Sequence, residues 1–381
     1  NVIYQISNYC IYMSKNSNDI VITTALRTAI GKYNGLWKDL KSHELGERVI
    51  KKILEKSNIK ASSIDEVILG QVLTGNTGQN SARQAAIKAG IPKETTGYII
   101  NQVCGSGLRA IVAGYQSLKL SETKIIIAGG QESMTNSTEE MMLKDGLIDA
   151  YENYHMGITA ENVAEKWNIS REEQDNFALI SQSKTQEAIS KNKFNDEMIS
   201  IDVKDEHPRQ DVTIENLSKL KTAFKKDGTV TAGNSSGIND GAACVLMMNR
   251  KESETNNLEP LAKIISWATC GVEPSLMGSG PIPASKLALK KAGWEIKDLD
   301  LIESNEAFAA QSLAVIKDLG LSKEKVNVNG GAIALGHPIG ASGARILVTL
   351  IHEMQKRKYK RGLATLCIGG GMGISMCVES I

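Results

Sequence analysis

The chain has 381 residues, of which 41% are hydrophobic and 23% charged, a composition typical of a soluble globular protein with two or three domains. The formal net charge is +1 and no basic stripe stands out, so a nucleic-acid partner is not expected. No apolar run reaches the roughly 18 residues that a membrane span needs, so no membrane partner is expected either.

The cysteines indicate a reducing compartment. Six cysteines, at positions 10, 104, 244, 270, 367 and 377, do not form a disulfide framework in a chain this long, and none is spaced as a CxxC metal pair. We expect free thiols and no metal site. Residues 1–12 lack the basic start and long apolar core of a signal peptide, which favours a cytoplasmic protein, or the mitochondrial matrix if the source is eukaryotic. Met13 is the expected natural start, with residues 1–12 as an addition.

The first third of the chain alternates β-like and helical segments. Residues 19–23 are rich in β-branched side chains, and residues 42–57 place Leu45, Val49 and Ile53 on one helical face. Such alternation predicts a βαβ sheet with helices on both faces. The remaining elements expected in this part are strands at 66–70, 98–103 and 124–128 and a helix from 106 to about 118.

The C-terminal part repeats this order. Residues 343–348 (GARILV) parallel residues 107–112 (GLRAIV), and residues 363–367 before glycines parallel residues 125–128 before glycines. We interpret the repeat as an internal duplication of a unit of roughly 120 residues, the alternative being chance similarity of two βαβ halves. The elements expected here are strands at 261–265, 299–303, 326–329 and 363–367 and helices at about 283–292 and from 343.

A different stretch, residues 131–236, lies between the two halves. It is polar and helix-rich, and Ser170 with Glu173 three residues later forms the pattern of a capping box. An insertion of this size usually covers or completes a binding site.

Cys104 is the first candidate for chemistry. It closes an apolar run and opens onto Gly105-Ser106-Gly107, where a helix is expected to begin. A helix N-terminus favours negative charge and lowers the pKa of a thiol, which creates a nucleophile. The competing interpretation is a buried structural cysteine, the commonest fate of this residue type.

Three further residues are candidates for the same chemistry. His337 lies in a glycine-rich segment before Pro338 and suits proton removal from a thiol, although a core histidine is the ordinary alternative. Asn305 follows an expected strand and is either a helix cap or a residue that orients a water as an oxyanion donor. Cys367 ends a strand before Gly369-Gly370-Gly371 and is a second acid or base.

Four ordered motifs make the chain resemble the thiolases, and closely the acetyl-CoA acetyltransferases among them, from about Ile20 to Ile381. The motifs are Val103-Cys104-Gly105-Ser106-Gly107, Asn305-Glu306-Ala307-Phe308, the run from Gly330 to Pro338, and the run from Cys367 to Gly373. The resemblance implies an α/β fold in which duplicated βαβ halves form a layered α/β/α/β/α core with an inserted loop domain. The implied divisions are 14–130 with 237–258 as the N-terminal half, 131–236 as the loop domain and 259–381 as the C-terminal half.

The resemblance also implies a reaction: two acetyl-CoA molecules join into acetoacetyl-CoA and CoA, reversibly and by a ping-pong mechanism. Cys104 would take the acetyl group with His337 activating it, and Cys367 would remove the α-proton of the second acetyl-CoA. His337 and a water held by Asn305 would form one oxyanion hole, and the N–H groups of Cys104 and Gly369 the other. This division suits carbon–carbon bond formation, which needs a covalent acyl carrier and a base beside a stabilised enolate.

By the same resemblance, coenzyme A and acetyl-CoA are substrates, with no tightly bound cofactor, and the loop domain binds them. The short-acyl preference rests mainly on His155 and Met156. Arg209 would lie near a coenzyme A phosphate, although a solvated loop residue is the plainer interpretation, and Met156 could be simple core packing. The implied contacts are Leu147, His155, Met156, Arg209, Ala232, Ser236 and Phe308.

One departure concerns assembly. The segment from Thr135 to Lys144 is shorter than in relatives, in which it includes the loop that pairs dimers into tetramers. We expect a homodimer, and a dimer of dimers stays open.

Two other functions compete with this one. The first is a degradative 3-ketoacyl-CoA thiolase of broader chain length. The second is of a different class, a non-catalytic thiolase-like protein that binds acyl-CoA or lipid, which would not need Cys104, His337 and Cys367 together. A decarboxylating ketoacyl synthase fits less well, because such relatives typically have other residues where Cys367 stands.

Overall fold

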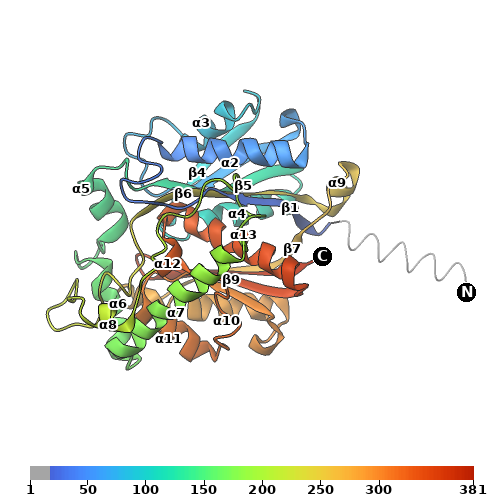
Figure 1. Cartoon of the computed structure of the whole chain (residues 1–381). Coiled ribbons are helices and arrows are strands. Elements are labelled where there is room, and N and C mark those ends of the chain that lie inside the picture. Colours follow the sequence, from blue (N-terminus) through green and yellow to red (C-terminus); the bar gives the residue numbers. More distant parts are fainter. Residues whose placement is uncertain (1–17) are drawn as a thin grey trace, which may run out of the picture.

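The computed structural model describes residues 18–381. Cys10, Met13 and the expected addition at residues 1–12 lie outside the described residues. Figure 1 shows five layers, in which two sheet halves alternate with an outer, a central and a second outer layer of helices. The expected α/β/α/β/α arrangement is therefore confirmed.

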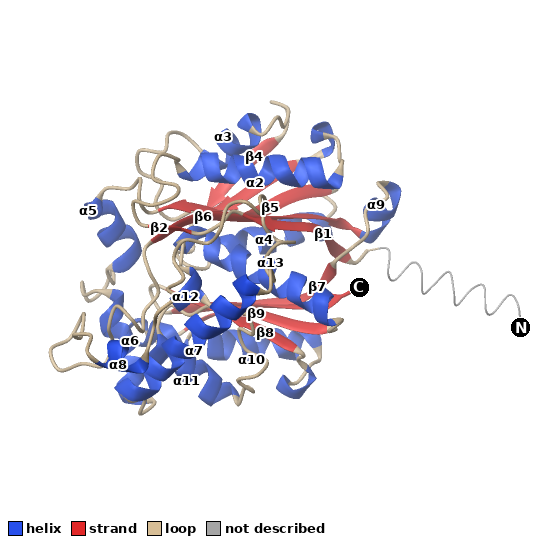
Figure 2. Cartoon of the chain, viewed as in Figure 1, coloured by secondary structure: helices blue, strands red, loops and turns tan. Residues whose placement is uncertain are grey.

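The strands form one sheet in the order β4-β3-β5-β6-β1-β7-β10-β9-β8, and β2 pairs with β6. Within residues 18–381, the strands of the two sheet halves pair with each other only where Val21 and Ile22 of β1 meet Lys263 and Ala262 of β7. Because this junction is so short, the halves turn apart and stack (Figure 2). The strands are β1 (Ile20–Arg27), β2 (Gly31–Lys32), β3 (Glu66–Gly70), β4 (Thr96–Ile100), β5 (Ile125–Ser133), β6 (Asn239–Asn249), β7 (Ala262–Gly271), β8 (Leu301–Ser304), β9 (Arg361–Ile368) and β10 (Met372–Ser380).

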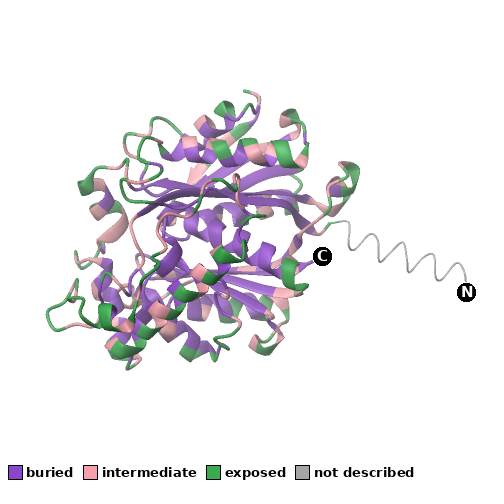
Figure 3. Cartoon of the chain, viewed as in Figure 1, coloured by how far each residue is buried: buried purple, intermediate pink, exposed green. Residues whose placement is uncertain are grey.

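The helices cover both outer faces and fill the space between the sheet halves (Figure 1). α4 (Ser106–Lys119) and α13 (Ile339–Arg357) form the central layer, with α2 and α3 outside one half and α10 and α11 outside the other. Figure 3 shows the central layer and both sheet halves buried, with exposed residues concentrated on the outer helices and loops. The other helices are α2 (Ser42–Ser57), α3 (Ser81–Lys88), α5 (Glu139–Met141), α6 (Met156–Lys166), α7 (Arg171–Ser190), α8 (Ile214–Ser218), α9 (Arg250–Thr255), α10 (Pro281–Ala292), α11 (Ala309–Leu319) and α12 (Ala332–Leu335), with short turns η1 (Ala61–Ser63), η2 (Met142–Leu147), η3 (Pro274–Ser279) and η4 (Ile296–Asp298).

The pairing of the strands repeats from one half to the other. β3 runs parallel to β5, and β5, β6 and β1 follow antiparallel to one another. In the same way, β8 runs parallel to β9, and β9, β10 and β7 follow antiparallel. Even a local detail recurs: the Asp65 carboxylate accepts the N–H groups that open β5, and the Asp300 carboxylate those that open β9. The internal duplication is thereby confirmed.

The sequence misplaced two strands. The expected strand at 98–103 ends at Ile100, because residues 101–103 turn sharply and leave the sheet. The expected strand at 326–329 is a single bridge between Val326 and Ile302, because Asn327 adopts a left-handed φ of 44° that ends the pairing.

The central helices cross at equivalent glycines. A Cβ atom on Gly107 would lie 2.9 Å from the backbone N of Ala344, and one on Gly343 would lie 2.5 Å from the backbone N of Leu108. The backbones of the two helices touch here, because each helix has a glycine, which lacks a side chain, at the point of contact. The crossing brings the N-termini of α4 and α13 together.

The region between the halves is helical as expected. Ser170 and Glu173 form the predicted capping box, with Ser170 N donating to Glu173 Oε2 at 2.7 Å and Glu173 N donating to Ser170 Oγ at 3.2 Å. The short segment 135–144 contains α5 and the start of the π-helical turn η2. Within residues 18–381, no helix combines the length and hydropathy that crossing a bilayer requires.

The crossing generates a stability prediction. We expect Gly343→Ala to destabilise the protein by about 1–3 kcal/mol, because the added methyl group overlaps the backbone of α4. Urea unfolding measures the change. The matched control is Gly271→Ala, since a Cβ there meets nothing closer than 3.9 Å. Equal stability of the two variants would contradict the direct backbone contact.

Candidate active site

Cys104 lies in a strained turn between β4 and α4. Val103, just before it, has a φ of +45°, an unusual value for a β-branched residue that costs about 1–3 kcal/mol. Hydrogen bonds hold the turn: Ser106 Oγ donates to Val103 O at 2.6 Å and accepts from Gln102 N at 2.8 Å. The turn aims Cys104 toward the C-terminal half, where its sulfur accepts a hydrogen bond from Gly369 N. Nothing in the sequence marked Val103 as strained.

The resting state of Cys104 is a thiol. The side chain is almost fully buried, and burial raises the pKa of the thiol to about 11. Hydrogen bonds from the N–H groups of Gly369 and of Cys104 itself act in the opposite direction and favour the thiolate. The prediction that the helix N-terminus lowers the pKa of Cys104 is therefore wrong, because the loss of hydration raises this pKa more than the N–H groups lower it. A thiol with so high a pKa needs a base.

His337 supplies a base whose tautomer is fixed by its neighbours. Ser342 Oγ donates to Pro338 O at 2.9 Å, so it accepts at its lone pair from His337 Nδ1, 2.5 Å away. Nδ1 then carries the hydrogen and Nε2 presents a lone pair. Burial, with a smaller contribution from Arg345, lowers the pKa of His337 to about 3, so the ring is neutral at physiological pH. The backbone N of His337 donates to Asn239 Oδ1 at 2.9 Å and anchors the loop.

Asn305 lies behind the imidazole. It follows β8, is fully buried, and its Nδ2 lies 3.5 Å from His337 Nε2. Its backbone N donates to Thr365 O at 2.9 Å, which ties it to β9. The alternative of a helix cap is wrong, because α11 begins at Ala309 with Phe308 in the N-cap position.

Cys367 is the most deeply buried of the four candidates. It is next to last in β9, has no exposed surface, and packs in one apolar cluster with Met156 and Phe308. Burial raises the pKa of its thiol, and the nearby Cys104 charge raises it further. Cys104, in the turn after β4, and Cys367, at the end of β9, thus lie close enough for the charge of one to act on the other.

A cavity of about 360 Å³ leads to these groups from the surface. Cys104 and His337 lie at its buried end with Gly369, and Arg209 and Ala232 are exposed at its rim. All seven residues expected to contact coenzyme A line this cavity, whereas Cys367 and Asn305 lie just behind its wall. These seven are Leu147, His155, Met156, Arg209, Ala232, Ser236 and Phe308.

Sequence reasoning missed part of the cavity wall. Phe224 stacks on His155 with ring centroids 4.5 Å apart and meets Phe308 edge-on at 6.2 Å. A lone aromatic residue in the polar run from Lys219 to Gly228 was the available signal. Other lining residues that were not predicted are Met134, Gly146, His207, Ala223, Ser235, Gly237, Ile238, Met277, Ala307 and Ile339.

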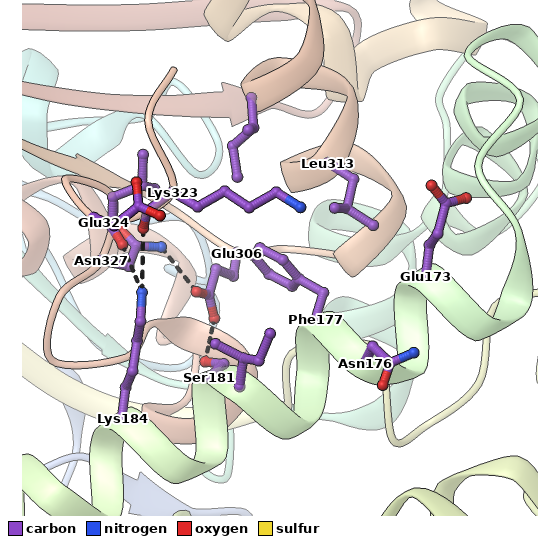
Figure 4. Close-up of a pocket in the computed structure, with 13 residues that line it drawn as sticks. Glu173, Asn176, Phe177, Ser181, Lys184, Glu306, Leu313, Lys323, Glu324 and Asn327 are labelled. Carbon is purple, nitrogen blue, oxygen red and sulfur yellow. Dashed lines mark hydrogen bonds between the residues drawn. The ribbon is translucent and has the colours of Figure 1, made fainter. Parts of the chain in front are cut away.

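A second cavity, of about 440 Å³, lies between α7, α11 and the loop at 323–327 (Figure 4). It is larger, but no cysteine or histidine lines it. The buried Glu306 carboxylate at its wall accepts hydrogen bonds from Ser181 Oγ at 2.7 Å and Asn327 Nδ2 at 2.8 Å (Figure 4). The reactive side chains lie in the smaller cavity, so chemistry rather than size identifies the candidate site.

No metal centre accompanies these groups: residues 18–381 contain no cluster of three or more histidine, cysteine or acidic side chains placed to hold an ion. The expectation of free thiols agrees with Cys104, Cys244, Cys270, Cys367 and Cys377, all of which are unpaired within this part of the chain.

Two family profiles together match nearly the whole described chain. The profile "Thiolase, N-terminal domain" matches residues 20–251, and "Thiolase, C-terminal domain" matches residues 258–380. The chain belongs to the thiolase family. The predicted family is thereby confirmed.

Several relatives are similar over their full length. A protein of Rhizobium meliloti named acetyl-CoA acetyltransferase is 53% identical over 95% of this chain and 99% of its own. The cytosolic acetyl-CoA acetyltransferase of Rattus norvegicus is 48% identical over 96% of this chain and 100% of its own.

Solved thiolase structures share the fold. The acetyl-CoA acetyltransferase of Bacillus anthracis superposes with a TM-score of 0.91 at 41% identity, covering 95% of this chain and 99% of its own. Human mitochondrial 3-ketoacyl-CoA thiolase in complex with CoA superposes with a TM-score of 0.92 at 42% identity, covering 95% and 98%.

The fixed tautomer of His337 generates a prediction for Ser342→Ala. Loss of the Nδ1–H acceptor frees the ring, so we expect alkylation of Cys104 by iodoacetamide to slow roughly tenfold, the worth of one hydrogen bond. Mass spectrometry of the Cys104 peptide follows the rate. The control is Ser266→Ala, which removes a buried hydroxyl bonded to Ala288 O at 2.7 Å away from the cavity. Equal rates in both variants would show that Ser342 does not orient the base.

Proposed function

We propose that this protein is an acetyl-CoA C-acetyltransferase that condenses two acetyl-CoA molecules into acetoacetyl-CoA and CoA, reversibly. The observation that carries the proposal is the position of Cys104 between a helix start, Gly369 N and the cavity that also holds the neutral His337. A buried thiol, a neutral imidazole base and a second thiol together suit acyl transfer followed by carbon–carbon bond formation.

In the first half-reaction, His337 Nε2 takes the proton of the Cys104 thiol as the sulfur attacks the thioester carbonyl. The C–S bond to coenzyme A breaks, and the leaving thiolate takes a proton from Cys367. The products are acetyl-Cys104, free CoA, a protonated His337 and a Cys367 thiolate. N–H groups of Cys104 and Gly369 stabilise the oxyanion formed on the way.

In the second half-reaction, Cys367 takes the α-proton of a new acetyl-CoA. The enolate oxygen accepts from protonated His337 Nε2 and from the water held by Asn305. The α-carbon then attacks the acetyl carbon, and Cys104 leaves as a thiolate that recovers its proton from His337.

The cavity wall supports a short acyl group. Met156 and Phe308 lie at the buried end in one apolar cluster with Cys367, and stacking of Phe224 on His155 stiffens the adjoining wall. At the rim, Arg209 is suited to a phosphate and Ser236 to the pantetheine arm. We therefore propose coenzyme A thioesters as substrates without a tightly bound cofactor, with residues 131–236 as the binding loop domain between halves 14–130 with 237–258 and 259–381.

Acetylation tests the proposal directly. After incubation with acetyl-CoA, we expect one acetyl group on Cys104, no acetyl group in Cys104→Ala, and loss of nearly all turnover in that variant. Cys367→Ala should still acetylate Cys104, more slowly because the leaving CoA thiolate lacks its proton donor, but fail in condensation, because the second half-reaction needs the α-carbon base. Peptide mass spectrometry reads the site. Acetylation at Cys367 in place of Cys104 would reverse the two roles.

A degradative 3-ketoacyl-CoA thiolase is the second candidate, favoured by the similarity to the human mitochondrial protein of that name. We expect thiolysis of acetoacetyl-CoA to be faster than that of 3-ketohexadecanoyl-CoA, because Met156 and Phe308 close the buried end of the cavity. Comparing kcat/KM for the two substrates decides, and a preference for the long chain would select the second candidate. A binding protein of the thiolase type would take up acetyl-CoA without exchanging label into acetoacetyl-CoA.

The homodimer, with or without pairing into a dimer of dimers, and the cytoplasmic location stay predictions. β4 is an edge strand of the sheet and carries the half-exposed Tyr98, which supports pairing with a second copy.

A further inference from the structure

Because the two halves are duplicated, the start of α4, where Cys104 lies, has an equivalent position in the C-terminal half, the start of α13. Ser106 and Ser342 precede the glycines at which α4 and α13 cross, so the residues two positions before them are equivalent. These residues are Cys104 and Gly340. Both are found where a central helix begins, and both helix starts present N–H groups that favour negative charge.

The two helix starts meet different residues from the opposite half. Glu132 lies seven residues after Ile125, whose N–H is held by Asp65, and Ile368 lies seven residues after Arg361, whose N–H is held by Asp300. Glu132 and Ile368 are therefore equivalent. Glu132 Oε2 accepts from Gly340 N at 2.9 Å, at the start of α13.

At the start of α4, the equivalent contact is apolar. A Cβ on Gly105 would lie 2.4 Å from Ile368 Cδ1, so Ile368 packs directly against this helix start. The isoleucine offers no negative charge to the N–H groups there. One helix start is thus occupied by a carboxylate, and the other is left for the sulfur of Cys104 and its reacting partner.

Glu132 joins three elements around the site. Its side chain is fully buried at the end of β5, and it accepts from Val72 N at 3.0 Å and Leu73 N at 3.2 Å, just after β3. With the bond from Gly340 N, the carboxylate fixes α13 only three residues after His337. Glu132 does not line the cavity.

We propose that Glu132 is a positioning residue, whose carboxylate fills the helix start equivalent to that of Cys104 and thereby holds the loop of His337 in place for the reaction. The proposal rests on the proposed function only for the reaction that His337 serves. The hydrogen bonds of Glu132 are observed in the structure and do not depend on that function.

The electrostatics give the proposal a measurable signature. Two titratable groups face Glu132 from neighbouring elements, Cys104 before α4 and Asp240 on β6. Burial raises the pKa of Glu132 to about 7, the three N–H donors lower it, and Asp240 raises it slightly. Burial is the main cause of the raised pKa of Cys104, and the negative charge of Glu132 raises it further. Removing that charge therefore eases ionisation of the thiol.

Glu132→Gln tests the role, because it keeps the side-chain volume and removes the charge. We expect kcat to fall on the order of tenfold with KM changed less than about twofold, because positioning is lost while the cavity lining is intact. We also expect the pH profile of Cys104 alkylation by iodoacetamide to shift to lower pH. A purely structural role would not move that profile in this direction.

The matched control is Glu161→Gln, since Glu161 is also a buried carboxylate that accepts backbone N–H groups, from Thr229 at 2.8 Å and Val230 at 2.8 Å. It should leave the alkylation profile unchanged. If Glu132→Gln does not fold, Glu132→Asp is the second variant. It keeps the charge but moves the carboxylate away from the three N–H groups, because its side chain is one methylene shorter, and the same fall in kcat is expected. Wild-type kcat in the folded variant, or an unshifted profile, overturns the proposal.

Failure of this proposal and failure of the proposed function are distinguishable. Alkylation of Cys104 requires no acyl transfer, so a shifted profile supports the role of the Glu132 charge even if no acetyl-Cys104 forms. Conversely, acetylation of Cys104 with an unshifted profile in Glu132→Gln retains the function and rejects the role.

Discussion

The close crossing of α4 and α13 is the constraint on which the rest of the structure depends. Gly107 and Gly343 let the two backbones touch, and the helix starts that carry Cys104 and lead from His337 therefore face the same small volume. A single methyl group at either glycine would separate them. The thiol and the imidazole come from residues more than 200 positions apart, and no local sequence element holds them together. Packing of the central layer, with the hydrogen bonds that Asn239 and Glu132 accept from the His337 loop, sets their distance.

Burial then decides which forms of these groups exist. Loss of hydration disfavours both the Cys104 thiolate and the His337 imidazolium, so the resting pair is uncharged. The N–H groups of the helix start and of Gly369 are fixed before a substrate arrives, and they have no resting anion to satisfy. Such a site stabilises charge only when the reaction creates it, which is the condition under which an interaction lowers a barrier rather than a ground state.

Repeated segments in the two halves were sufficient for the duplication, and the resemblance to the thiolases supplied the layered fold and seven of the residues that line the cavity. The sequence was insufficient where distant contacts override local preference. Val103 reads as the end of a strand, yet the turn held by Ser106 forces it to a positive φ. Residues 326–329 read as a strand but give one bridge. Glu132 reads as an ordinary polar residue, because its partners Val72, Leu73 and Gly340 are backbone groups that no pattern reveals.

The unequal helix starts also bear on how such a chain arises. Two identical halves that associate as separate copies carry the same residue at both helix starts, so a carboxylate at one implies a carboxylate at the other. Covalent fusion of the halves removes that restriction, because each position then mutates independently. Glu132 opposite Gly340 and Ile368 opposite Gly105 are a difference that two identical copies cannot have. Specialisation of one half for chemistry and of the other for support is thus a property that joining the halves makes accessible.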